Sequence, residues 1–158
     1  MSQQLKRRTK ILTCAEMARI EGLAIEAKGP KLGEKFMEEV GYELAQRICE
    51  DPVDKSHILL LCGKGNNGGD AYLAGSLLLQ KGFKVSSLQM GTLYECSPLC
   101  QKMAKRFQEA RGKVYSDTNE PFESSSLIID GLLGTGFKGL VNQTFANVIK
   151  QANDSKKT

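Results

Sequence analysis

The chain has 158 residues, 41% hydrophobic and 25% charged, which is the size and composition of one globular domain. Its net charge of +4 lies largely in residues 5–10 and at Lys156 and Lys157, which is typical of solvated ends and not of a nucleic-acid surface. Without a long apolar run or an apolar N-terminal leader, we expect a cytoplasmic protein with no membrane or nucleic-acid partner.

Two helices are predicted ahead of any strand, after a basic tail over residues 1–12. Thr13 and Glu16 form a T-x-x-E capping box at the start of the first helix, and Gly29-Pro30 ends it. Apolar residues recur at every fourth position of the second helix and predict one apolar face, made by Leu32, Phe36, Val40, Leu44 and Ile48. Gly41 within that helix is either tolerated, at about 1 kcal/mol, or marks the close approach of another helix. We expect this pair to cover a sheet edge or a partner chain.

Four short apolar strands alternate with helices in the rest of the chain. Strands are predicted over 57–62, 83–90, 113–116 and 126–130. Helices are predicted over 71–82, 97–111 and 142–152, and Ser97 and Pro98 begin the second of these helices. Residues 117–125 are predicted to form an acidic loop. Such strands are typical of a parallel sheet covered on both faces, and right-handed crossovers give the strand order 3-2-1-4. The predicted fold class is therefore α/β, with one domain over residues 13–158.

The cysteines and the single histidine carry no sign of a metal site. The five cysteines include no C-x-x-C pair, which favours free thiols in a reducing compartment over disulfides or zinc. His57 stands at the entry to the first strand without a nucleophile signature, so we expect a structural or surface role for it.

A glycine-rich turn, GKGNNG at residues 63–68, joins the first strand to the next helix. It matches G-x-G-x-x-G in the right context, where glycines allow a tight turn and the helix N-terminus offers N–H groups to an anion. The alternative is a structural turn in which Asp70 or an asparagine caps the helix. An ordinary dehydrogenase or a P-loop is disfavoured, because the second strand lacks its terminal acid and no Lys-Ser/Thr follows the glycines.

A second turn, GTGFKG at residues 134–139, repeats this pattern after the fourth strand. Because the first and fourth strands are neighbours in the predicted order, both turns should converge on one crevice. Asp130 ends the fourth strand and Asn67 follows the first, and with loop carbonyls they suit a hard cation, either monovalent or Mg²⁺. The alternative is that Asp130 only accepts N–H bonds from its own loop.

Three segments of the chain resemble the YjeF N-terminal family, the NAD(P)H-hydrate epimerases. They are residues 62–85, from CGKGNNGGD onward, residues 128–141, IIDGLLGTGFKGLV, and the leading helical pair at residues 13–45. The resemblance implies a Rossmann-like three-layer α/β/α sandwich. It also implies epimerisation of hydrated NADH or NADPH (NADHX or NADPHX) at the 6-hydroxy carbon, which lets a partner NAD(P)HX dehydratase repair the cofactor. A homodimer is expected as well.

The same resemblance assigns site residues by position. Asn67 and Asp130 would bind one K⁺, and Asp70 is the candidate for proton transfer. The residues implied in substrate binding are Asn66, Asn67, Gly68, Gly69, Asp70, Gly134, Thr135, Gly136, Phe137, Lys138, Gly139 and Leu140.

The chain also departs from the family pattern. Lys64 stands where the family commonly has proline or a small residue, and Ala71 stands where glycine is common. No D-x-P-S-G-type loop follows the last helix, so the domain is expected to be truncated at its C-terminal side. The alternatives to an epimerase are a non-catalytic nucleotide- or RNA-associated scaffold and a nucleotide-sensing domain.

Overall fold

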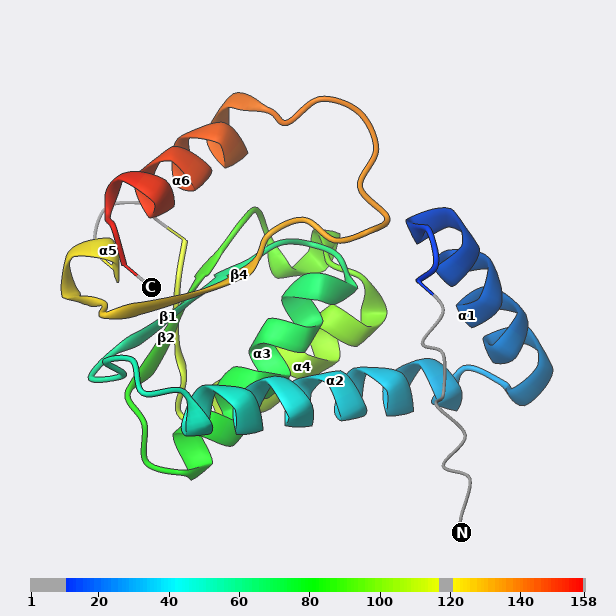
Figure 1. Ribbon diagram of the computed structural model, residues 1–158, viewed down its shortest axis with the longest axis horizontal. Helices are drawn as coiled ribbons and strands as arrows, with labels where there is room; N and C mark the ends of the chain where they lie inside the picture. The colour runs from blue at the N-terminus through cyan, green and yellow to red at the C-terminus, as the bar shows by residue number, and fades with distance from the viewer. Residues whose placement is uncertain (1–10, 117–120, 158) are drawn as a thin grey trace, which may run out of the picture.

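The computed structural model describes residues 11–116 and 121–157, so most of the predicted basic tail and part of the predicted acidic loop lie outside it. Within these residues, four parallel strands form one sheet in the order β3-β2-β1-β4 (Figure 1). The strands are β1 Ile58–Cys62, β2 Val85–Gln89, β3 Lys113–Tyr115 and β4 Leu127–Gly131. The predicted α/β class and the predicted strand order are confirmed.

Helices cover both faces of this sheet (Figure 1). On one face lie α2 Lys31–Glu50, α3 Asn66–Gln80 and α4 Pro98–Glu109, and on the other lie α5 Pro121–Ser124 and α6 Gln143–Asp154. Alternate residues of β1 belong to two separate apolar cores, Ile58 and Leu60 to the first and Leu59 and Leu61 to the second. Burial of β1 on both faces explains its unbroken apolar sequence.

The first helix, α1 Cys14–Lys28, begins with the predicted capping box. The Thr13 hydroxyl accepts from the Glu16 N–H at 3.2 Å, and the Glu16 carboxylate accepts from the Thr13 N–H at 2.9 Å. No residue of α1 is buried, and Met17, Ile20 and Leu23 are exposed, whereas Ala24 and Ile25 are partly buried. Most of the apolar stripe of α1 is therefore exposed on this chain.

The predicted apolar face of α2 is confirmed at Ile48 and in part at Leu44, which packs against the core, and is wrong at Val40. The buried residues of α2 are Met37, Gly41, Ala45 and Ile48, whereas Val40 is 49% exposed. A strict spacing of four drifts around a helix of 3.6 residues per turn, so the chosen series leaves the buried face. Gly41 marks the close approach of α3, because a Cβ on it would lie 2.6 Å from Leu73 Cγ.

The helix predicted over 71–82 begins five residues earlier, so the second half of the first glycine turn forms the opening of α3. Glycine disfavours helix, but here tertiary packing outweighs propensity. A Cβ on Gly69 would lie 2.7 Å from Met37 Cε, and one on Gly75 would lie 2.4 Å from Leu60 Cδ1. The glycines of α3 are thus contact points with α2 and the sheet.

Smaller differences concern element ends. The second strand is shorter than predicted, α4 ends at Glu109, and the predicted acidic loop contains the single turn α5. Ser97 caps α4 and Pro98 opens it, as predicted.

His57 has the expected structural role. Its side chain is buried, with Nδ1 2.9 Å from the Ser124 carbonyl oxygen and Nε2 2.9 Å from Ser86 Oγ. The five cysteines are free thiols. In the described part of the chain, no helix combines the length and apolar character that a membrane crossing needs.

Candidate functional site

The two glycine turns meet at the carboxyl ends of β1 and β4. The Gly63 N–H donates to the Gly131 carbonyl at 3.0 Å, and the Asn67 side-chain amide donates to the Leu133 carbonyl at 3.2 Å. A Cβ on Gly134 would lie 3.1 Å from Asn67 Cβ. The predicted convergence of the two turns at the carboxyl end of the sheet is confirmed.

Close backbone packing explains the glycines of the first turn. A Cβ on Gly63 would lie 1.9 Å from the Leu132 carbonyl oxygen, and one on Gly68 would lie 2.3 Å from the Gly63 carbonyl oxygen. The first turn therefore folds back on itself and lies directly against the residues that follow β4.

The N-terminus of α3 has no side-chain cap. Gly65 is its N-cap residue, so neither Asp70 nor an asparagine caps the helix. The first turn is held instead from the segment between β2 and α4, because the Ser97 N–H donates to the Lys64 carbonyl and Ser97 Oγ donates to Asn66 Oδ1, both at 2.8 Å. Uncapped N–H groups at this position suit an anionic ligand. Ser97 was expected only as a cap of α4, and no local pattern marks its contact with Asn66.

Asp70 is partly buried in the second turn of α3. Burial, together with the smaller effect of the charge of Glu21, raises the pKa of its carboxyl to about 6. Glu21 belongs to α1, so α1 contributes to the electrostatics of this edge, which sequence reasoning missed. A carboxyl with this pKa can hold and release a proton near neutral pH.

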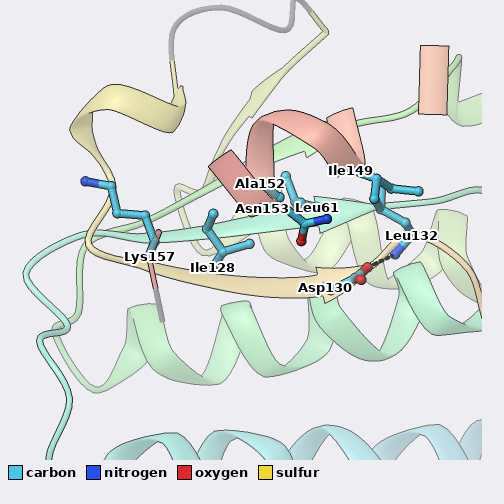
Figure 2. A pocket seen from close by; sticks show the side chains of 8 residues that line it. All are labelled: Leu61, Ile128, Asp130, Leu132, Ile149, Ala152, Asn153 and Lys157. Atoms are coloured by element: carbon cyan, nitrogen blue, oxygen red, sulfur yellow. Dashed lines mark hydrogen bonds between the residues drawn. The ribbon is translucent and has the colours of Figure 1, made fainter. Parts of the chain in front are cut away.

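Asp130 lines a pocket between the sheet and α6 (Figure 2). Its Oδ1 accepts from the Leu132 N–H at 2.9 Å, which is the loop bond that the sequence left as an alternative. The pocket has a volume of about 190 Å³. Its lining consists of Leu61, Ile128, Asp130, Leu132, Ile149, Ala152, Asn153 and Lys157.

Asn67 and Asp130 have the donor chemistry that a potassium ion needs. The Asn67 side-chain nitrogen donates to the Leu133 carbonyl, and one of the two Asp130 oxygens accepts from the Leu132 N–H. The Asn67 oxygen and the second Asp130 oxygen are of the type that hard cations prefer. Among the described residues there is no group of three or more histidine, cysteine or acidic side chains that could hold a metal ion, so carbonyl oxygens would have to complete such a site. The shared cation site stays a prediction.

The second glycine turn is open. Its residues from Gly134 to Leu140 are all exposed, including Phe137 at 43% and Leu140 at 97%. One backbone bond, from the Phe137 N–H to the Gly134 carbonyl at 3.0 Å, closes it locally. Both apolar side chains and Lys138 therefore remain accessible to a ligand.

Comparison with known proteins agrees with this arrangement. A family profile described as YjeF-related protein N-terminus matches residues 33–158. The chain is 34% identical over 149 residues to a Rhodopirellula baltica protein named NAD(P)H-hydrate epimerase, covering 91% of this chain and 60% of that protein. A protein of the same name from Rhodobacter capsulatus is 31% identical over 81% of this chain and 63% of its own length.

A solved structure shares the fold. The crystal structure of the yeast protein YNL200c superposes with a TM-score of 0.75, at 21% identity, over 93% of this chain and 66% of that one. The chain thus spans a little under two thirds of the curated relatives and of the solved structure.

Proposed function

Because the chain belongs to the family of YjeF-related N-terminal domains, we propose that it is an isomerase that interconverts the R and S forms of hydrated NADH or NADPH at the 6-hydroxy carbon. The relatives named NAD(P)H-hydrate epimerase support this activity. The observation that carries the proposal is the meeting of two glycine turns at one sheet edge beside Asp70, whose carboxyl pKa is raised to about 6.

Two parts of this edge would bind the substrate. The residues from Asn66 to Asp70 open α3, whose uncapped N-terminus suits the pyrophosphate. The residues from Gly134 to Leu140 are exposed and would contact the phosphates or the hydrated ring, with Lys138 suited to a phosphate oxygen. Both segments would also contribute backbone groups, which fits their glycine content.

Asp70 is the proposed proton-transfer residue. The substrate is a hemiaminal, so its carbon loses and regains the hydroxyl, or its ring opens and closes, and either route moves a proton at oxygen or nitrogen. A carboxyl with a pKa of about 6 donates a proton to the departing group and accepts one on its return.

A potassium ion is the proposed cofactor, held by Asn67 and Asp130. These residues bind the backbone of Leu133 and Leu132, just before the second turn. When bound, the ion would supply positive charge beside the substrate's phosphates. Asn67 and Asp130 also order the second turn by their own hydrogen bonds.

The proposed partners follow from the same activity. An NAD(P)HX dehydratase would consume the product, and the exposed apolar residues of α1 are the proposed homodimer surface. The free thiols fit a cytoplasmic location.

The test is the rate at which purified R and S epimers of hydrated NADPH interconvert, followed by chromatography with K⁺ or Na⁺. We expect a rate above the spontaneous one that falls at least about 100-fold in Asp70→Asn. Glu43→Gln, which changes an exposed acid on α2, is the matched control. Interconversion at the spontaneous rate by the folded wild-type chain would contradict the proposal and favour a binding-only role.

A further inference from the structure

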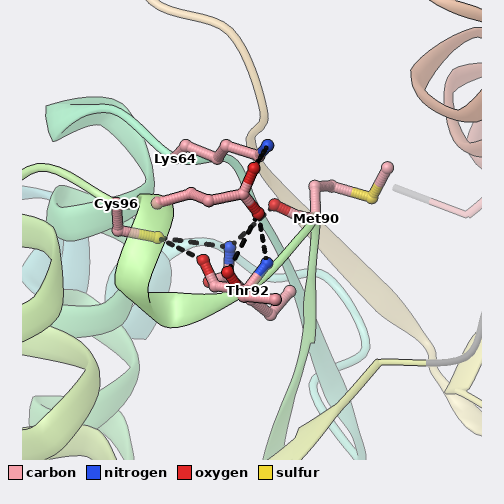
Figure 3. A network of polar contacts seen from close by, with 6 residues as sticks. Lys64, Met90, Thr92 and Cys96 are labelled. Atoms are coloured by element: carbon pink, nitrogen blue, oxygen red, sulfur yellow. Dashed lines mark hydrogen bonds and ion pairs between the residues drawn. The ribbon is translucent and has the colours of Figure 1, made fainter.

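An ion pair joins the ends of the first two strands (Figure 3). Lys64 follows β1 and Glu95 lies in the short helix η1, Leu93–Glu95, which follows β2. Lys64 Nζ lies 2.7 Å from Glu95 Oε1, and the two side chains are 39% and 50% exposed. Both charged groups are therefore accessible to a ligand at this edge of the sheet.

The carboxylate of this pair is fixed in place. Its second oxygen accepts from the Thr92 N–H at 2.9 Å and from the Thr92 hydroxyl at 3.0 Å. The hydrogen bond from Lys64, followed by those from Thr92, lowers the pKa of the Glu95 carboxyl to about 2. Glu95 is thus a charged and oriented group at neutral pH, while the Lys64 ammonium has one carboxylate partner and a flexible stem.

The Lys64 side chain lies directly over the backbone that leaves β2. The residue there is Gly91, with φ of +80°, and a Cβ on it would lie 2.4 Å from Lys64 Cε and 2.9 Å from Lys64 Nζ. Any larger residue at this position would push the lysine away. The lysine side chain therefore packs against the carboxyl end of β2, although Lys64 belongs to the turn after β1.

In dinucleotide-binding sheets, the carboxyl end of the second strand recognises the adenosine ribose. A carboxylate at the end of the second strand binds the 2′-hydroxyl of the adenosine ribose, and a basic side chain near it accepts a 2′-phosphate. The segment VSSLQMG, residues 85–91, contains no charged residue. Lys64 and Glu95 supply both charges from outside the strand.

We propose that Lys64 and Glu95 are the specificity-determining residues for the 2′ position of the substrate's adenosine ribose, and that Lys64 gives the chain a preference for hydrated NADPH over hydrated NADH. An exposed ion pair contributes little stability, so Lys64 can leave Glu95 for a more highly charged phosphate. A 2′-hydroxyl carries no charge and leaves the pair intact. Glu95 limits the preference, because it competes for Lys64 and repels the incoming phosphate.

The proposal rests on the proposed function for its substrate, but its test needs no turnover. Adenosine 2′,5′-bisphosphate and adenosine 5′-monophosphate differ only in the 2′-phosphate, and their dissociation constants can be measured by calorimetry at low salt. We expect the wild-type chain to bind the bisphosphate about tenfold more tightly, a difference of about 1.4 kcal/mol.

Two variants should move this ratio in opposite directions. Lys64→Met should reduce it to about one, whereas Glu95→Gln, which keeps an oxygen for Thr92, should raise it above the wild-type value. Lys102→Met breaks the comparable exposed pair with Glu34 and is the control, with an unchanged ratio. Circular dichroism checks that each variant is folded.

The outcomes separate the two proposals. A tenfold ratio that Lys64→Met removes, in a chain that does not interconvert the epimers, supports this inference and contradicts the proposed function. If the chain interconverts both hydrates with equal efficiency and binds the two adenosine phosphates equally tightly, this inference alone is overturned. Equal loss of the ratio in Lys64→Met and Glu95→Gln also overturns it, because a merely structural pair would behave in that way. A failure to bind either probe at millimolar concentration overturns it as well.

Discussion

The two glycine turns share one sequence pattern but have opposite surroundings. In the first, a Cβ on Gly63 would collide with the Leu132 carbonyl oxygen at 1.9 Å, whereas in the second a Cβ on Gly136 would meet nothing within 4 Å. The backbone approached by the first turn belongs to the protein itself, at Leu132, between β4 and the second turn. In the second turn, Gly136 and Gly139 are open to solvent, whereas Gly134 lies close to Asn67. A G-x-G-x-x-G pattern thus indicates close backbone approach or open backbone, and only the structure distinguishes them.

The most direct test of this difference in packing is to add one methyl group to each turn. Gly63→Ala forces a backbone oxygen to move, so we expect the free energy of unfolding to fall by at least about 3 kcal/mol. Gly136→Ala has room for its methyl group and restricts the unfolded chain, so stability should be unchanged or rise by about 0.5 kcal/mol. Urea denaturation measures both. Similar losses in the two variants would show that the turns are equally packed.

A second prediction tests how much the first turn holds the second. Asn67→Ala removes the amide that donates to the Leu133 carbonyl, which should cost about 1–2 kcal/mol and loosen the residues after it. Trypsin cleavage after Lys138 should therefore become faster. Asn147→Ala, at an exposed position of α6, is the matched control. An unchanged cleavage rate in Asn67→Ala would mean that the second turn is ordered without the first.

The smallest expected effect concerns Asp70, in the second turn of α3. Burial, assisted by Glu21, raises its pKa from 3.8 to about 6, so the folded state binds its proton more tightly than the unfolded state does. Its contribution to stability is therefore present at low pH and is lost as the pH rises from about 4 to 6. Asp70→Asn should be more stable than the wild type at pH 7 by about 1 kcal/mol, a value reduced for solvent screening, with a smaller gain near pH 4.

Urea denaturation at several pH values measures this difference. Glu43→Gln is again the control for loss of one acid. A gain that is equal at pH 4 and pH 7 would show that Asp70 is not perturbed by its burial.

The order of the strands could be predicted because it depends on local signals. Each apolar run in the sequence carries its own strand, and the chirality of crossovers then limits the sheet to few arrangements. The start of α3 could not be predicted in this way, because Asn66 to Asp70 read as a flexible turn until Met37 and Cys100 pack against Gly69. The predicted face of α2 was wrong at Val40 for a related reason, because α2 approaches Leu73 of α3 through Gly41, a residue that a pattern of large apolar side chains does not include.

The residues that the sequence assigns to the candidate site come from the two glycine turns, from the residues just after each turn and from Asp130 at the end of the fourth strand. Asp70 and Asn67 stand inside a recognisable pattern, and their position at the sheet edge followed from the strand order. Ser97, Glu95 and Glu21 reach the same edge from other elements, and each has an ordinary local explanation, as a helix cap or an exposed acid. Their second contacts depend on tertiary structure, which no spacing in the sequence reports.

The glycines of α3 also bear on the order of events during folding. Gly68, Gly69 and Gly75 each cost an isolated helix about 1 kcal/mol, so α3 has little tendency to form by itself. The same glycines let Met37, Leu60 and the Gly63 carbonyl approach the α3 backbone. The helix therefore gains its stability only once α2 and β1 are already in place. Its formation is expected to come after the rate-limiting step, so substitutions along α3 should accelerate unfolding more than they slow folding.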